Sequence, residues 1–271
     1  MRFPYNHYQR LAGPFTVYYP SREGVDGAQL GMQQEEYAHW VAQTISRASE
    51  RLTELFERPA PDMELVVVKS EDWSLVPRGD LKEEHASRPY WTDETTPPTL
   101  VVPMEIDPTF GTITREKIAF MLYHELALAF LEADPRPWPD ESPLWGDEWQ
   151  FQFVAVWLSS SLDGVQGTVN QDLHDQYADI FEPEPDGKTP VTVRGFDWYE
   201  DTSAEDYLCY ELLLERFAID LLARYDIHIL PRFLTSYRVE RDVLLSDDVT
   251  RLLAASLGPG GEEWLEALVY F

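Results

Sequence analysis

The chain has 271 residues, of which 44% are hydrophobic, and a formal net charge of −28 from 49 acidic and 21 basic residues. This length suffices for one large domain or two small ones. The negative field repels phosphate backbones, so we expect no nucleic-acid binding. No apolar run approaches the roughly 18–20 residues of a membrane-spanning helix, so we expect no membrane insertion. The single cysteine, Cys209, excludes an intramolecular disulfide and a thiolate metal cluster.

The acidity has two interpretations. A negative surface attracts basic peptides, basic proteins or cations. It also suits a solvated surface in a salty environment, where the repulsion is screened, and we favour this second interpretation. Residues 1–10 are polar and aromatic and contain no apolar signal core, so we expect a soluble, cytoplasmic protein for the chain as given.

Strand patterns and one long helix characterise the first half. We expect strands at Phe15–Tyr19, Met63–Val68 and Thr99–Met104, and a helix at Gln33–Phe56. The continuous apolar run of the second strand indicates burial on both faces. The polar, proline-containing stretch 71–98 is expected to be a long loop with one short element.

The second half is predicted to be helical. We expect helices at Thr114–Ala133, Pro143–Leu162, Ser203–Tyr225, Leu230–Arg238, Ser246–Leu257 and Glu262–Tyr270. Residues 163–201 are rich in Gly, Pro and Asp and are expected to form an insertion or a long loop. Thr202 with Glu205 fits a capping box, and Gly258 is a plausible helix stop. Cys209 is expected to be a small buried residue within its helix.

The element order predicts an α+β protein. A small N-terminal mixed sheet with a long helix should precede a mostly helical C-terminal half. We expect one domain over residues 1–271, with a sheet-containing subdomain at about 1–135 and a helical subdomain at about 136–271.

The segment His124-Glu125-Leu126-Ala127-Leu128 lies inside one of the predicted helices. Zinc peptidases use His-Glu-x-x-His in such a helix because positions i and i+4 project from one face and can both bind the metal. The glutamate between them acts as general base on the metal-bound water. Here the first histidine and the glutamate are present, and Leu128 occupies the second histidine position. A His-Glu pair in a helix does not by itself indicate a metal site. The neighbouring segments of the sequence therefore have to show whether it belongs to one.

The next predicted helix opens with Pro143-Leu144-Trp145-Gly146-Asp147-Glu148. Together with the first segment and the order of strands before it, this stretch resembles the gluzincin zinc metallopeptidases, whose Pro-x-Trp-x-x-Glu stretch supplies the third zinc ligand. The resemblance covers roughly Phe15 to Phe271 and implies a zincin-like fold. It implies His124 and Glu148 as metal ligands and Glu125 as the catalytic base. Tyr210, with Tyr207 as the second match, takes the position of the tyrosine that stabilises the oxyanion.

Two departures from the family pattern bear on activity. Leu128 cannot coordinate a metal, and Trp149 follows Glu148 where the family has small residues, so the site is expected to be filled with apolar groups. A four-ligand zinc site contributes roughly 10–16 kcal/mol, which gives about 3 kcal/mol per ligand. Losing one ligand therefore weakens zinc binding about a hundredfold. We expect no cofactor, or zinc if His85, His174 or Asp147 serves as a substitute ligand.

Three functions stay open at this point. The chain is expected to be a non-catalytic gluzincin homologue, because its metal site has decayed. It is alternatively an active zinc-dependent peptidase with a substitute ligand, or an acidic protein-interaction module that captures a basic peptide or protein.

Overall fold

The computed structural model describes residues 3–21, 29–77, 86–181, 191–197, 202–239 and 243–271. The chain divides into two compact units, unit 1 at Met1–Ala133 and unit 2 at Asp134–Phe271. Unit 1 contains the sheet and unit 2 is helical, so the predicted α+β class is confirmed.

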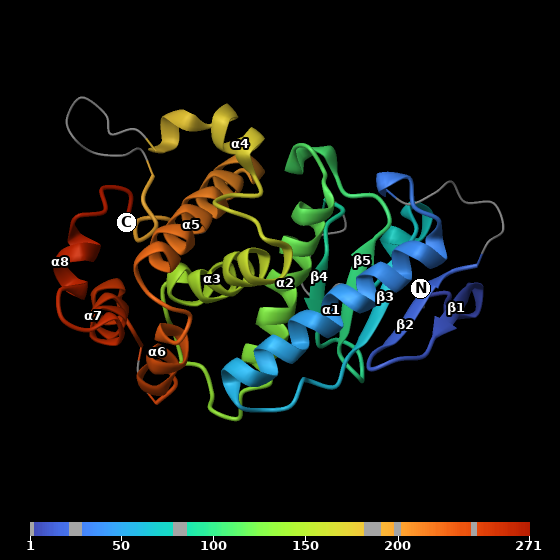
Figure 1. Cartoon of the computed structure of the whole chain (residues 1–271), viewed down its shortest axis with the longest axis horizontal. Coiled ribbons are helices and arrows are strands. Elements are labelled where there is room, and N and C mark those ends of the chain that lie inside the picture. Colours follow the sequence, from blue (N-terminus) through green and yellow to red (C-terminus); the bar gives the residue numbers. More distant parts are fainter. Residues whose placement is uncertain (1–2, 22–28, 78–85, 182–190, 198–201, 240–242) are drawn as a thin grey trace. The chain divides into compact units, whose positions relative to one another are not determined.

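A five-stranded mixed sheet forms the centre of unit 1 (Figure 1). Its strands are β1 (Tyr8–Leu11), β2 (Thr16–Pro20), β3 (Glu64–Val68), β4 (Tyr90–Thr92) and β5 (Thr99–Pro103), in the spatial order β1-β2-β3-β5-β4. The three inner strands are parallel to one another, and each edge strand is antiparallel to its neighbour. The three expected strands are therefore confirmed, with the apolar β3 and β5 at the centre of the sheet.

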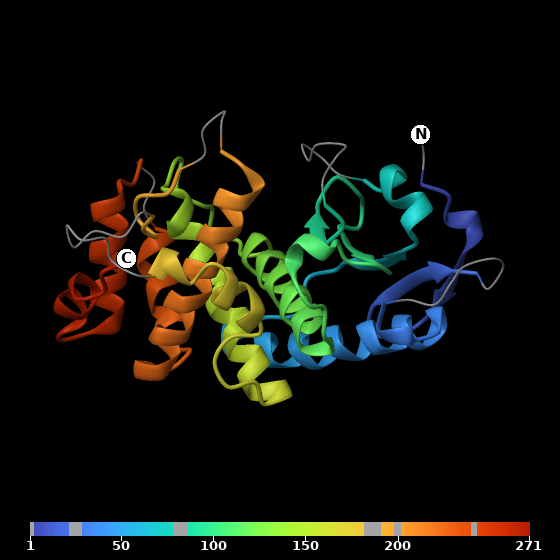
Figure 2. The same ribbon diagram turned by 90° about the horizontal axis from the view of Figure 1, so that it is seen from above.

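Side chains cover both faces of this sheet. Helices α1 (Gln34–Phe56) and α2 (Arg115–Glu132) pack against each other, and they contact β2 and β4 respectively. Figure 2 shows α1 running along one face of the sheet. On the other face, Val66, Val68 and Val101 join an aromatic cluster that includes Phe3 and Tyr8. Because successive residues of a strand point to opposite faces, the continuous apolar run of β3 serves both layers.

Unit 1 contains short elements that the sequence pattern did not predict. The stretch 71–98 was expected to hold one short element, but it contains part of the 3-10 helix η3 (Ser70–Leu75) and also β4. Strand β1 was not expected. The Tyr8 hydroxyl donates to Asp72 at 2.9 Å, so β1 and η3 stabilise each other through a contact between residues 64 positions apart. The remaining 3-10 helices of the unit are η1 (Tyr5–His7), η2 (Gln29–Gly31) and η4 (Pro108–Phe110).

Unit 2 is built around two helices that pack along each other (Figures 1 and 2). These are α3 (Leu144–Asp163) and α5 (Ala204–Arg224), and α3 carries buried residues around its whole circumference. The other helices are α4 (Gln171–Gln176), η5 (Ala178–Phe181), α6 (Ile229–Tyr237), α7 (Ser246–Leu257) and α8 (Gly261–Glu266). Helix α7 contacts both α6 and α8. A helix that is apolar all round must be enclosed by its neighbours, which makes α3 the core of this unit.

The expected helices of unit 2 are present, with local differences. The stretch 163–201 was expected to be a loop, but its described part contains α4 and η5. Helix α8 ends at Glu266, four residues earlier than expected. Gly258 does end α7, with a φ of +86°, and Cys209 is buried within α5 as expected. None of the helices formed by the described residues is both long and apolar enough to cross a lipid bilayer.

The capping box of α5 differs from the predicted one by one position. Ser203 caps the helix, its hydroxyl accepting from the Asp206 amide at 3.1 Å, while the Ser203 amide donates to the Asp206 carboxylate at 3.0 Å. Thr202 and Glu205 were predicted for these roles. The spacing is the same, so the sequence pattern identified the motif but not its register.

We expect Ser203→Ala to lower the free energy of unfolding by about 1 kcal/mol, because one amide of the first turn loses its acceptor. Urea denaturation followed by circular dichroism measures the change. Thr202→Ala is the matched control and should have a smaller effect, since α5 begins after Ser203. Equal effects of the two substitutions would contradict the assigned cap.

Candidate functional site

Helix α2 of unit 1 carries His124 and Glu125. Its first turn is capped by Thr114, whose hydroxyl accepts from the Lys117 amide at 3.2 Å. The His124 and Glu125 side chains are 17% and 12% exposed, and His124 Nδ1 lies 3.2 Å from Glu125 Oε1. The two candidate residues therefore contact each other, although adjacent residues on a helix do not usually face one another.

The second oxygen of Glu125 binds the backbone of the sheet. The Trp91 amide donates to Glu125 Oε2 at 2.9 Å. Trp91 lies in the edge strand β4, opposite Leu100 of β5, so this amide bonds the helix rather than a neighbouring strand. An unpaired buried amide costs free energy, and a carboxylate is a strong acceptor for it. Glu125 thus links α2 to the edge of the sheet.

Leu128 lies one helical turn beyond His124 and is half-buried, between the buried Ala127 and Ala129. Positions i and i+4 share a helix face, so the side chain that faces the same way as the imidazole is a branched hydrocarbon. It has no lone pair to offer. A gluzincin zinc ion needs two imidazoles from this helix. The donors that α2 presents therefore do not fit that ion.

Unit 2 carries Glu148 and Tyr210, the other two residues that the resemblance implies. Glu148 lies in α3 and is half-buried, whereas Tyr210 lies in α5 and is fully buried. Burial raises the pKa of Tyr210, and the charge of nearby Glu148 raises it further. The two residues lie on helices that pack along each other, and the charge of Glu148 acts on the Tyr210 hydroxyl.

The Tyr210 ring is held by a neighbouring aromatic ring. It stacks on Phe196, with 4.2 Å between the ring centroids, while Tyr207 lies 6.1 Å away and is half-buried. The hydroxyl of Tyr210 is buried and has no hydrogen-bond partner among the described residues. A phenol in this environment stays neutral, so it can act only as a hydrogen-bond donor or acceptor.

The structure places Trp149 differently from the sequence expectation. The residue was expected to crowd a metal cleft, but its ring lies in the aromatic core of unit 2 and is fully buried. The rings of Phe233, Phe153 and Phe217 lie 5.0, 5.8 and 6.5 Å from it. Because α3 is enclosed on all sides, a bulky residue after Glu148 can point into the core. Trp149 is therefore a packing residue.

Two of the proposed substitute ligands already have partners within unit 2. Asp147 accepts from the Tyr237 hydroxyl at 2.5 Å and from the Ser142 hydroxyl at 2.8 Å. His174 Nε2 lies 3.1 Å from Glu215 Oε2. The third candidate, His85, lies outside the described residues. Within either unit, the described His, Cys, Asp and Glu side chains form no group of three that could hold a metal ion.

Glu215 is a buried carboxylate that the sequence analysis did not identify. It is 1% exposed and also accepts from the Val169 amide at 3.2 Å and from the Asn170 side chain at 3.0 Å. These bonds attach the segment before α4 to the middle of α5. In the sequence, Glu215 looks like any other acidic residue of an amphipathic helix. Only its tertiary contacts distinguish it from the exposed acidic residues of α5.

The role of Glu125 can be tested by comparing two substitutions. Glu125→Ala leaves the Trp91 amide without its acceptor and should lower the free energy of unfolding by about 1–3 kcal/mol. Glu125→Gln keeps one oxygen acceptor and should cost clearly less. Urea denaturation measures stability, and hydrogen exchange of the Trp91 amide reports the bond directly. An exchange rate that is equal in wild type and Glu125→Ala would contradict the link between α2 and β4.

The buried carboxyl of Asp147 predicts a pH effect. Burial raises its pKa in the folded state, although the hydrogen bonds from Tyr237 and Ser142 oppose this. The folded state therefore binds the proton more tightly than the unfolded state. The resulting contribution to stability is fully present below the unfolded pKa and is lost as the pH rises through the folded pKa.

We expect Asp147→Asn, which keeps an acceptor for Tyr237, to remove this contribution. The stability of wild type relative to the variant should then increase as the pH falls from neutral towards 4. Urea denaturation across this range measures the difference. Asp140→Asn, at an exposed position, removes the same formal charge as a control. A difference between wild type and Asp147→Asn that is constant with pH would refute the assignment.

The candidate residues are thus divided between the two units, with His124 and Glu125 in unit 1 and Glu148 and Tyr210 in unit 2. His124 contacts Glu125, and the charge of Glu148 acts on Tyr210, whereas the convergence of all four on one metal stays a prediction. Comparison with models of known protein families and with curated proteins finds no match to this chain.

Proposed function

We propose that this chain is a non-catalytic homologue of the gluzincin metallopeptidases. The observation that carries the proposal is Leu128, which occupies the position of the second zinc-binding histidine on a helix that otherwise retains the His-Glu pair. Without the metal, the general base has no bound water of lowered pKa to deprotonate. Peptide hydrolysis by the remaining groups is then negligible.

The contacts of Glu125 support the same proposal. A general base must be able to reach the attacking water with a carboxylate oxygen. Here both oxygens have partners within unit 1, one in the Trp91 amide and one in the His124 ring. A carboxylate used in this way stabilises the fold, which gives a reason to retain Glu125 in the absence of catalysis.

An active zinc peptidase with a substitute ligand is the second candidate. The observation that favours it is that Glu148 and the buried Tyr210, to which the resemblance assigns ligand and oxyanion roles, lie on two helices that pack along each other. It requires a third donor, and both Asp147 and His174 would have to give up contacts within unit 2. Chelator-sensitive cleavage of a basic peptide that disappears in Glu125→Gln would establish this candidate.

Repair of the missing ligand tests the first proposal. We expect the wild-type protein, purified without chelator, to contain much less than one zinc ion per chain. Leu128→His creates an imidazole pair at i and i+4 and should raise zinc affinity about a hundredfold. Competition with a chromophoric chelator measures the affinity, and elemental analysis measures the zinc content.

Two variants control for this repair. Leu128→Ala removes the leucine without adding a donor, and the double variant His124→Ala, Leu128→His keeps the new imidazole but removes its partner. Neither should gain affinity. Stoichiometric, tightly bound zinc in the wild type would refute the proposal. A folded Leu128→His variant with unchanged affinity would show that the two segments do not form a gluzincin-like site.

A further inference from the structure

Two helices of unit 2 that pack along each other, α3 and α5, each carry a buried polar group that no described residue bonds. These groups are the side-chain carbonyl of Gln152 on α3 and the hydroxyl of Tyr210 on α5. The two residues are 4% and 0% exposed. A polar group that leaves water without gaining a new partner costs free energy, so buried polar groups nearly always have one. Each of the two therefore calls for a partner from outside the chain.

Both residues face the opposite helix. On α5, Tyr210 and Phe217 are seven residues apart and share a face, and the Phe217 ring centroid lies 6.5 Å from that of Trp149 on α3. On α3, Gln152 lies about 40° around the helix axis from Glu148 and about 60° from Trp149, between the two. The charge of Glu148 raises the pKa of Tyr210. The side of α3 that contains Gln152 therefore faces α5.

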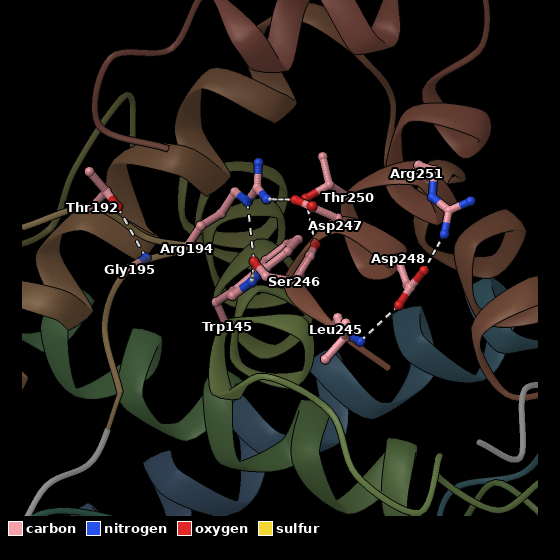
Figure 3. Close-up of polar contacts among 10 residues, drawn as sticks. All are labelled: Trp145, Thr192, Arg194, Gly195, Leu245, Ser246, Asp247, Asp248, Thr250 and Arg251. Carbon is pink, nitrogen blue, oxygen red and sulfur yellow. Dashed lines mark hydrogen bonds and ion pairs between the residues drawn. The ribbon is translucent and has the colours of Figure 1, made fainter. Parts of the chain in front are cut away.

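The Tyr210 ring is held in one place, which fixes the position of its hydroxyl. Phe196 stacks on it, with 4.2 Å between the ring centroids. Two residues before Phe196, Arg194 binds Asp247 and donates to the Ser246 hydroxyl at 3.2 Å (Figure 3). These bonds anchor the segment that carries Phe196 to the start of α7. A flip of the phenol ring about its own axis leaves the hydroxyl oxygen where it is, so its partner has to come to it.

The hydrogen-bonding capacities of the groups on the facing sides select the kind of partner. The phenol of Tyr210 offers a hydrogen, whereas the carbonyl of Gln152 and the carboxylate of Glu148 only accept. A water molecule in a protein interior makes about three hydrogen bonds, and it can accept one and donate two. An ammonium group has no lone pair for the phenol hydrogen, and an anion has no hydrogen for the two acceptors. Water matches all three groups.

We propose that a buried water molecule bridges α3 and α5, accepting from the Tyr210 hydroxyl and donating to the Gln152 carbonyl and the Glu148 carboxylate. A carboxylate has about four lone-pair sites, so Glu148 can accept from this water beside its other contacts. The bridge gives Tyr210 and Glu148 a structural role in joining the two principal helices of unit 2. The inference uses no residue of unit 1 and no zinc, so it stands or falls separately from the gluzincin proposal.

A high-resolution crystal structure tests the proposal directly. In the wild type we expect an ordered water within hydrogen-bond distance of both the Tyr210 hydroxyl and the Gln152 carbonyl. In the double variant Tyr210→Phe, Gln152→Met, whose new side chains have similar size but no group to bond it, that water should be gone. A wild-type electron-density map with no water between the two groups, or with a cation in its place, would overturn the proposal.

Urea denaturation provides a second test in solution. Tyr210→Phe and Gln152→Met should each raise the equilibrium constant of unfolding about fivefold, because each breaks the bridge. The double variant should raise it about tenfold rather than about twenty-five-fold, since the same water is lost only once.

Gln150→Met is the matched control. The Gln150 carbonyl is also buried without a partner among the described residues, but it lies on the opposite side of α3 from Glu148. Its effect should therefore add to that of Tyr210→Phe. Additive effects of Gln152→Met and Tyr210→Phe would contradict a shared water. So would a single variant at either position that is more stable than the wild type, since that follows when the removed group had no partner at all.

Discussion

The carboxylate of Glu125 is held between the backbone amide of Trp91 and the ring of His124, and these two contacts limit what helix α2 can do. A buried carboxylate needs donors, and an amide at the edge of a sheet needs an acceptor. When the carboxylate of Glu125 accepts from the amide of Trp91, the bond holds helix α2 against the edge strand β4. A catalytic glutamate must instead leave an oxygen available to water.

The same helix accommodates a leucine at position 128. Leu128 is half-buried, whereas Leu126 and Ala127 beside it are fully buried. A leucine at such a position contributes apolar contact to the fold. A histidine there would need a hydrogen-bond or metal partner to offset its desolvation. In a chain without zinc, leucine is thus the more stable choice at this position.

Unit 2 shows how an apolar helix constrains its neighbours. Because α3 is buried around its circumference, the residues after Glu148 pack as core, and the ring of Trp149 lies among three phenylalanines. Two buried carboxylates of this unit have side-chain partners, Glu215 with His174 and Asp147 with Tyr237.

The sequence by itself determined the α+β class, the three central strands and the long helices. These features follow from local periodicity, from apolar runs and from proline and glycine, all of which act within a few residues. It also determined that Leu128 cannot coordinate a metal, since that is a property of the side chain. Only the tertiary structure decided the partners of single side chains. The Tyr8 hydroxyl of β1 bonds Asp72, Glu125 bonds the amide of Trp91, and Trp149 packs against rings from other helices. Such contacts join residues far apart in the chain, and no local pattern encodes them.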